Sequence, residues 1–208
     1  MFYFENDVLK SDFLEGVEHY FTTRNCTFSP DGIAPEQTHS DHVEFVDERL
    51  EYPDTDGLII TKPNQTIRLK FADCTPLIFY DPKTNIGAIA HAGWRGTAQK
   101  IGVKTVQKMD VNPKDIIAII GPAIGLCCYE VSDEVKEKLL ATVQNPTGLY
   151  KDRNVDLKAI NARQLQEIGV EKIDICPYCT SCDNDLFYSY RKENGTTNRH
   201  YAVLRLPE

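Results

Sequence analysis

The chain has 208 residues, of which 41% are hydrophobic and 26% charged, and its formal net charge is −8 at pH 7. This composition is typical of a globular protein with a substantial core. The negative balance argues against a general nucleic-acid binder, which normally carries a basic face, and no stretch reaches the roughly 18 apolar residues that a membrane span needs. We therefore expect neither a nucleic acid nor a membrane as a partner.

The N-terminal segment MFYFENDVLK is too short and too charged to be the apolar part of a signal peptide. The seven cysteines, an odd number, indicate thiols or metal ligands rather than a disulfide framework. We therefore expect a cytoplasmic protein. No repeat or flexible linker divides the sequence, which predicts one domain over residues 1–208.

Short segments rich in Ile, Val, Tyr and Phe predict strands. In chain order they cover residues 17–22, 57–61, 67–71, 76–80, 86–91, 116–120, 187–191 and 201–206. Helices are predicted over 94–109, 133–142 and 156–168, and in the first of these Ile101, Thr105 and Met109 share one face. Strands and helices interleave without a strict βαβ alternation, which predicts an α/β (α+β) domain with a mixed sheet.

Three residues of metal-binding type lie near predicted strand ends. His39 is in the polar segment EQTHSDHV, Cys74 follows Asp73, and His91 ends the strand IGAIAH. Imidazole and thiolate are ligands that Zn²⁺ prefers, and three protein ligands leave the open position of a catalytic site. Their spacing matches no compact zinc finger, so the fold would have to assemble the site. The alternative is that Cys74 packs in the core and His91 caps a turn.

Two predicted strands run into glycine-rich turns. HAGWRGT places Arg95 at the start of a predicted helix, where N–H groups and a guanidinium can bind phosphate or carboxylate. IGPAIGLCCYEV, which contains Gly121 and Gly125, predicts a second junction of strand, glycine turn and helix. A plain connecting turn is the alternative for both.

The segment CPYCTSC holds Cys176, Cys179 and Cys182. A Cys-x-x-Cys pair indicates a metal or redox site, but a second pair of this spacing is missing. The adjacent Cys127 and Cys128 could not easily both bind with these cysteines. Packing near a strand is therefore favoured over a second metal site.

Aromatic residues and arginines are mixed in HYFTTRNCTFSPDG and LFYSYRKENGTTNRHYAVLRL. Such residues could line a pocket that stacks a flat ring and holds an anion. The pattern alone slightly favours the alternative, a hairpin with solvated arginines. The pocket candidates are Phe21, Arg24, Tyr190, Arg191 and Arg199.

Five segments resemble, in order, the signatures of one family: QTHSDHV, ADCTPLIFYD, IGAIAHAGWRGT, IGPAIGLCCYEV and FYSYRKENGTTNR. This is the YfiH/YlmD family, also called the laccase-domain, multicopper polyphenol oxidase or purine nucleoside phosphorylase family. The resemblance implies a mixed-sheet sandwich flanked by helices and related to the catalytic domain of cytotoxic necrotizing factor. It also implies Zn²⁺, or Cu²⁺ in its place, bound by His39, Cys74 and His91. The sequence departs from the family at Asn25-Cys26, where Gly-Gly is usual, and at Asn198, where Gly precedes the arginine.

The resemblance further implies a zinc-dependent enzyme that phosphorolyses adenosine, inosine, guanosine and methylthioadenosine and also deaminates adenosine. We expect its catalytic residues to be Cys74, His91 and Asp73, the last because it is the carboxylate nearest in sequence to a ligand. Asp73 can act as general acid or base only if the strand breaks beside it, which Thr75-Pro76 favours. The residues expected to hold the nucleoside and phosphate are Phe21, Arg24, Arg95, Gly125, Arg191 and Arg199.

Three alternatives stay open. A four-copper oxidase needs about ten histidines, and this chain has five, so copper-dependent oxidation at the single site would be a side activity. A Cys74 thiolate could instead attack an acyl carbon, as in a hydrolase or amidase acting on a peptidoglycan precursor. The third alternative is a regulatory domain that binds a metal or nucleotide. The sequence leaves the oligomeric state open.

Overall fold

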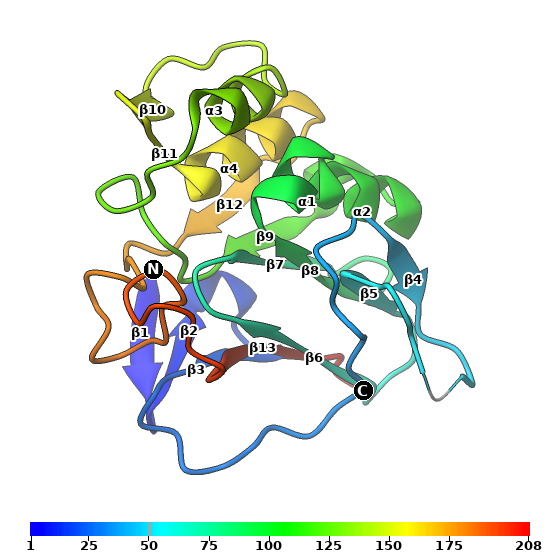
Figure 1. Cartoon of the computed structure of the whole chain (residues 1–208). Helices are drawn as coiled ribbons and strands as arrows, with labels where there is room; N and C mark the ends of the chain where they lie inside the picture. Colours follow the sequence, from blue (N-terminus) through cyan, green and yellow to red (C-terminus); the bar gives the residue numbers. More distant parts are fainter. Residues whose placement is uncertain (50) are drawn as a thin grey trace.

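Two β-sheets and a layer of helices are stacked in the computed structural model, which describes residues 1–49 and 51–208 (Figure 1). The first sheet has five antiparallel strands in the order β1-β2-β3-β13-β6. Its strands are β1 (Phe2–Glu5), β2 (Val8–Ser11), β3 (Glu18–Thr22), β13 (His200–Arg205) and β6 (Thr66–Phe71). The two ends of the chain thus contribute to one sheet.

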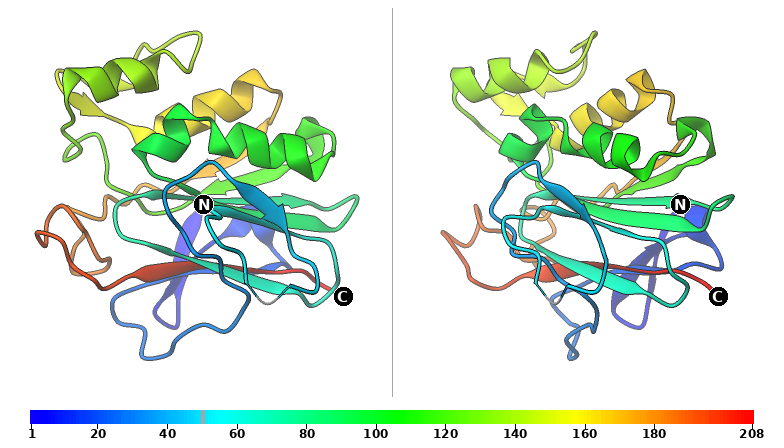
Figure 2. Two further views of the ribbon diagram at one scale, coloured as in Figure 1. Left: turned by 45° about the vertical axis from the view of Figure 1, so that its right-hand side comes forward. Right: turned by 90° about the vertical axis from the view of Figure 1, so that its right-hand side faces the viewer.

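The second sheet has six strands in the order β12-β9-β7-β8-β5-β4 and lies between the first sheet and the helices (Figure 2). The β12–β9 and β4–β5 pairs are parallel, and the other pairs are antiparallel. The mixed sheet predicted from the sequence is therefore present. Its strands are β12 (Lys172–Ile175), β9 (Ile117–Ile120), β7 (Thr75–Asp81), β8 (Ile86–Ala92), β5 (Gly57–Ile60) and β4 (Val43–Phe45).

The outer face of the six-stranded sheet is covered by helices α1 (Trp94–Ala98), α2 (Ile101–Met109) and α4 (Leu157–Glu167) (Figure 1). Helix α3 (Asp133–Leu140) packs against α1, further from the sheet. Smaller elements are the 3₁₀ turns Asp12–Leu14 and Pro113–Asp115 and the hairpin of β10 (Tyr150–Lys151) and β11 (Asn154–Val155). Within the described residues, none of the helices has the length and apolar character that crossing a bilayer requires.

Each face of the central sheet is buried against a different layer. Leu58 and Ile60 of β5 join the core between the sheets, whereas Ile59 joins the core beneath the helices with Ile101 and Met109 of α2. Successive side chains of a strand point to opposite faces, so a strand covered on both sides is apolar throughout. This explains why the central strands read as continuous apolar runs.

Most predicted elements are present, with boundaries shifted by a residue or two. The strand predicted over 187–191 is wrong, because this segment forms turns in which Gly195 N–H donates to the Tyr190 carbonyl and Glu193 N–H to that of Ser189. The helix predicted over 94–109 is divided in two by Lys100, whose φ of 59° is left-handed. The helix expected after Gly125 is absent, since residues 126–128 form only a turn.

His200 is fully buried beside Phe71 and Phe187. Neither ring nitrogen has a hydrogen-bond partner among the described residues. Burial, assisted by the charge of Arg199, lowers the pKa of His200 to about 3. Between this value and the pKa of about 6.5 in the unfolded chain, only the unfolded state binds the proton, so stability falls as pH falls below 6.5.

His200→Phe removes this titration while keeping an aromatic ring in the site. We expect the wild-type free energy of unfolding to lose about 2 kcal/mol more than that of the variant between pH 7.5 and pH 5. Urea unfolding at a series of pH values measures how steeply the free energy of unfolding of each protein depends on pH. This comparison holds even if the two proteins differ in stability at pH 7.5. Parallel curves over this range would show that His200 is not the group responsible.

Candidate metal and nucleoside site

The pairing of β5 with β8 places Asp56 beside His91. Gly57 is opposite Ala90 in this antiparallel pair, and one residue further along, His91 N–H donates to the Asp56 carbonyl at 2.7 Å. The imidazole Nδ1 lies 2.6 Å from Asp56 Oδ1, with both side chains buried. Because a carboxylate accepts here, Nδ1 carries a proton and Nε2 is the nitrogen available as a metal ligand.

The same carboxylate organises the segment that carries His39. Asp56 accepts hydrogen bonds from the backbone N–H groups of Thr38, His39 and Ser40 at 3.0, 3.1 and 2.7 Å. His39 itself has a left-handed backbone with φ of 64°, which these bonds hold in place. One buried acid therefore positions both histidines.

Cys74 lies at the corner where the chain passes from β6 in one sheet to β7 in the other. Asp73 in this corner has φ of 81°, so the strand does break there and its alternation ends. The backbone of Gly93 approaches closely, since a Cβ at that position would lie 2.9 Å from Cys74 Sγ and 3.2 Å from His39 Cδ2. This close approach explains the glycine that begins the GWRG turn.

These three segments bring the side chains of His39, Cys74 and His91 together. One ligand atom from each residue lies within 4.8 Å of the others. Two imidazoles and a thiolate match the donor set of Zn²⁺, and the hydrogen bond from His91 Nδ1 to Asp56 fixes the tautomer that a metal requires. The residues present therefore fit a zinc ion, with the remaining coordination position open.

The site also pairs opposite charges. Removal from water raises the pKa of Cys74, but the imidazoles of His91 and His39 outweigh this effect and lower it to about 6. Burial lowers the pKa of His91, but Cys74 and Asp56 raise it to about 9. Burial raises the pKa of Asp56, but its bond to His91 and the N–H groups lowers it to about 2. Before a metal binds, carboxylate, imidazolium and thiolate thus form a chain of alternating charge, and a metal would displace the Nε2 proton of His91.

Two hollows meet at this group. The larger, of about 570 Å³, is also lined by Tyr129 and Tyr190, with further walls from Gln37, Lys70, Ala72, Asp73, Arg191 and Arg199. The smaller, of about 160 Å³, is lined by Trp94 and Arg95 and shares His39, Asp73, Cys74 and Tyr129 with the first. The larger volume is in the range of small-molecule sites.

Several residues predicted from the sequence lie around these hollows. Arg191 stacks over Tyr129 with 5.4 Å between the guanidinium carbon and the ring centroid, and Arg199 lies 6.0 Å over Tyr190. Asp73 accepts hydrogen bonds from the Thr180 hydroxyl at 2.6 Å and from Arg191 N–H at 2.7 Å. The predicted set of Asp73, Arg95, Arg191 and Arg199 is therefore assembled in one place.

Three predicted substrate residues lie elsewhere. Phe21 is fully buried in the core between the sheets. Its ring packs on Gly121 so closely that a Cβ at position 121 would lie 2.3 Å from Phe21 Cε1. Arg24 stacks over Tyr188 and pairs with Glu193 at 2.7 Å. Within the described residues, Phe21, Arg24 and Gly125 are outside the walls of both hollows. Their sequence motifs are explained by packing and ion pairing.

The cysteine prediction is also corrected. Cys176 is buried in the core, as expected of a packing residue. Cys127 and Cys128, however, lie beside Cys179 and Cys182, because the chain turns at 126–128 and directs both side chains to one side. Gly125 belongs to this group, since its N–H donates to Cys179 Sγ at 3.2 Å.

Other site residues carried little signal in the sequence. Asp56 is one of many acidic residues, and only the register of β5 with β8 shows that it meets His91. Tyr129 and Thr180 lie in loops far apart in the chain that converge on Asp73 and Cys74. Gln37 also lines the larger hollow, and its closeness to His39 in the sequence is the one feature that could have indicated this position.

A family model described as "Multi-copper polyphenol oxidoreductase laccase" matches residues 18–207. The chain belongs to this family. The matched region includes His39, Cys74 and His91 and the walls of both hollows. The resemblance read from the sequence motifs is thereby confirmed.

The chain is similar to curated members of this family. It is 36% identical over 200 residues to "Purine nucleoside phosphorylase YlmD" of Bacillus subtilis, covering 85% of this chain and 71% of the relative. It is 38% identical over 164 residues to the YlmD protein of Geobacillus stearothermophilus, covering 73% of this chain and 60% of the relative. The alignments therefore leave part of each relative uncovered.

Solved structures of the family share the fold along almost the whole chain. The YfiH protein of Bacillus licheniformis superposes with a TM-score of 0.90 at 29% identity, covering 99% of this chain and 98% of that one. YlmD of Geobacillus stearothermophilus also gives a TM-score of 0.90, at 28% identity and with coverage of 100% and 99%. The two-sheet architecture is thus the family fold.

Asp56→Asn tests the positioning of His91. An asparagine directs an N–H donor or a weaker amide oxygen at Nδ1, which disturbs the tautomer that leaves Nε2 free. We expect zinc affinity to fall by about 10- to 100-fold, measured by competition with a chromogenic chelator. Asp54→Asn is the matched control, because Asp54 bonds the Thr38 hydroxyl in the same segment and does not contact His91. Equal affinities in the two variants would contradict the role given to Asp56.

Proposed function

We propose that this protein is a zinc-dependent purine nucleoside phosphorylase that also deaminates adenosine. The observation that carries the proposal is the position of the His39–Cys74–His91 group at the junction of a nucleoside-sized hollow and a smaller one that contains an arginine. The relatives that are named purine nucleoside phosphorylase support the same reaction. The expected substrates are adenosine, inosine, guanosine and methylthioadenosine.

The larger hollow has the chemistry of a purine site. Tyr129 and Tyr190 offer aromatic faces, and each is paired with an arginine, Arg191 or Arg199. Aromatic rings and guanidinium planes stack on nucleobases, while the guanidinium edge binds polar groups of the ring or ribose. A nucleoside placed here has its reacting centre near Asp73 and Cys74.

The smaller hollow suits the phosphate. Arg95 is its cationic group, and its guanidinium lies 5.1 Å over the ring of Trp94. An arginine held by a ring presents its donors in a fixed orientation, which matches the bidentate recognition of phosphate oxygens. Phosphate and nucleoside would then meet beside the residues that the two hollows share.

In phosphorolysis a phosphate oxygen forms a bond to the ribose C1′ while the bond from C1′ to the purine nitrogen breaks. The electron pair of the broken bond goes to the purine, which takes up the proton that hydrogen phosphate loses on becoming the ester. Both oxygens of Asp73 accept hydrogen bonds, which supports a role in opposing positive charge on the ribosyl carbon or in accepting a proton rather than donating one. A bound Zn²⁺ would supply Lewis acidity for the addition of water to the purine in deamination.

The arrangement favours one second candidate, a Cys-His hydrolase or amidase. Cys74, His91 and Asp56 are arranged as nucleophile, base and orienting acid. In such an enzyme the sulfur attacks an acyl carbon, and the same thiolate cannot simultaneously serve as a metal ligand. Dependence on zinc therefore separates the two candidates. Oxidation by a four-copper centre has no support, because His19 accepts from Ser11 N–H, His42 pairs with Glu44 and His200 is in the core.

The products of the reaction test the proposal. With inosine and phosphate, we expect the zinc-loaded protein to release hypoxanthine and ribose 1-phosphate. With adenosine it should form adenine and inosine, and without phosphate only inosine, because phosphate is the nucleophile for base release alone. Chromatography of the products, with and without phosphate, measures each reaction.

Chelation of zinc is the control for this experiment. If chelation abolishes both phosphorolysis and deamination and added zinc restores them, the result supports the metal-dependent phosphorylase. Base release that persists without phosphate, with free ribose as product, would make the protein a nucleosidase. Absence of product from any purine nucleoside, together with turnover of amides that survives chelation, would favour the Cys74 hydrolase instead.

Arg95→Lys tests the phosphate subsite. Lysine keeps the charge but loses the bidentate geometry, and hydrogen bonds to charged groups contribute about 1.5–3 kcal/mol. We expect the KM for phosphate to rise by about tenfold or more, with the KM for inosine little changed, in initial-rate measurements. Arg163→Lys, at a partly exposed arginine that donates to the Asn145 carbonyl away from both hollows, is the matched control. An unaltered phosphate dependence would assign Arg95 a structural role.

A further inference from the structure

Four cysteines outside the site described above converge where two parallel strands end. β9 and β12 are neighbours in the central sheet, with Ile120 opposite Ile175, so both strands leave the sheet at the same edge. The pairing continues beyond the strands through Cys176 N–H to the Ile120 carbonyl at 2.8 Å and Thr180 N–H to the Ala123 carbonyl at 3.1 Å. The two loops that follow therefore run side by side.

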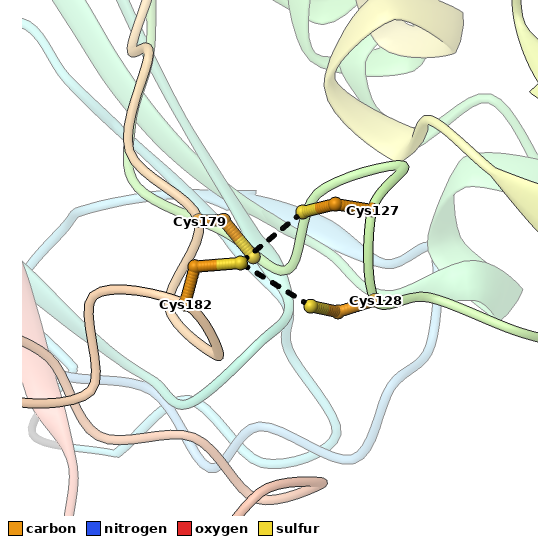
Figure 3. A group of neighbouring side chains, drawn as sticks. All are labelled: Cys127, Cys128, Cys179 and Cys182. Carbon is orange, nitrogen blue, oxygen red and sulfur yellow. Dashed lines mark hydrogen bonds between the residues drawn. The ribbon is translucent and has the colours of Figure 1, made fainter.

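Each loop contributes two of the four sulfur atoms. The loop after β9 carries Cys127 and Cys128, and the loop after β12 carries Cys179 and Cys182. Figure 3 shows the four side chains pointing toward one another from the two loops. All four Sγ atoms lie within 4.8 Å of one another, and that of Cys182 is 3.4 Å from those of both Cys127 and Cys128.

This spacing is that of a tetrahedral ion with four sulfur ligands. With bonds of about 2.3 Å, the sulfurs of a zinc tetrathiolate are about 3.8 Å apart. An iron–sulfur cluster distributes its ligands over more than one iron atom and would need the loops to stand further apart. Thiols are weak donors and acceptors, so the four groups gain little from one another without a cation between them.

Hydrogen bonds from the backbone and from Lys158 hold the two loops. Gly125 N–H donates to Cys179 Sγ at 3.2 Å, a bond that a thiolate accepts better than a thiol does. Lys158 of α4 anchors the second loop by donating to the carbonyls of Cys176 and Tyr178 at 2.6 and 2.8 Å. The loops are thus held in position by bonds that do not involve the sulfurs.

We propose that Cys127, Cys128, Cys179 and Cys182 bind one Zn²⁺ in a closed, structural four-thiolate site. This ion is separate from the one assigned to His39, Cys74 and His91, and the two groups share no residue. All four positions are filled by protein, so the site has no room for a substrate. Metal binding releases the thiol protons and forms four zinc–sulfur bonds without any redox change.

Such an ion would link the two loops that support the nucleoside cavity. Tyr129, which lines both hollows, directly follows Cys128. Thr180, whose hydroxyl donates to Asp73, lies between Cys179 and Cys182. Joining the loops through the metal fixes the distance between these two groups. This consequence rests on the proposed function, whereas the metal site itself does not.

Zinc content of the full-length protein and its variants tests the proposal. We expect Cys74→Ser, which disables the first site, to retain one zinc per chain. Inductively coupled plasma mass spectrometry measures this content. The double variant Cys74→Ser/Cys182→Ser should retain none, and Cys182→Ser alone should hold one zinc fewer than wild type. Cys26→Ser is the matched control, because Cys26 bonds the Asp7 carbonyl away from both groups, and it should keep the wild-type content.

Cobalt substitution in the Cys74→Ser background identifies the ligands. Four thiolates around Co²⁺ give intense sulfur-to-metal charge-transfer bands and the visible bands of a tetrahedral ion, which the added Cys182→Ser change should weaken. Cys182 is exposed, so its substitution is compatible with folding, which circular dichroism checks. Equal zinc in Cys74→Ser and the double variant, bound iron with a visible chromophore, or a disulfide among these cysteines in the purified protein would each overturn the proposal. A failure of the phosphorylase assay alone would leave these zinc counts unchanged and would bear only on the proposed function.

Discussion

Asp56 presents one buried carboxylate to two separate parts of the site. One oxygen meets His91 Nδ1 at 2.6 Å, and together the two oxygens accept the N–H groups of residues 38–40. A buried charge is tolerable only when it is fully paired, so the carboxylate, the imidazole and the 38–40 segment stabilise one another. The positions of His39 and His91, two of the three candidate ligands, therefore depend on Asp56.

The remaining ligand is positioned by a change of sheet. The chain leaves β6 and enters β7 through a corner at Ala72–Cys74, and the left-handed backbone of Asp73 makes that corner possible. The corner lies at the edge where both sheets approach the turn after β8, so Cys74 faces Gly93 and the two histidines. The candidate ligands are therefore presented by strand ends and turns that the packed sheets hold in place.

The family description and the site chemistry point in different directions. The words "multi-copper" and "laccase" describe a class of enzyme that needs many histidines, whereas three of the five in this chain serve packing or surface pairing. A single three-ligand group beside aromatic and arginine side chains is the arrangement expected of a nucleoside enzyme. The names of the YlmD relatives agree with that interpretation.

The sequence by itself determined the mixed α/β class and most of the strands, because these depend on local apolar patterns, and its motifs pointed to His39, Cys74 and His91 as candidate ligands. It could not show that Asp56 meets His91, that Phe21 is buried against Gly121, or that Cys127 and Cys128 meet Cys179 and Cys182. Each of these contacts joins segments that are distant in the chain. Which segments become neighbours is decided by strand order and register, and a register change of one residue turns every side chain to the opposite face. That information exists only in the packed sheets.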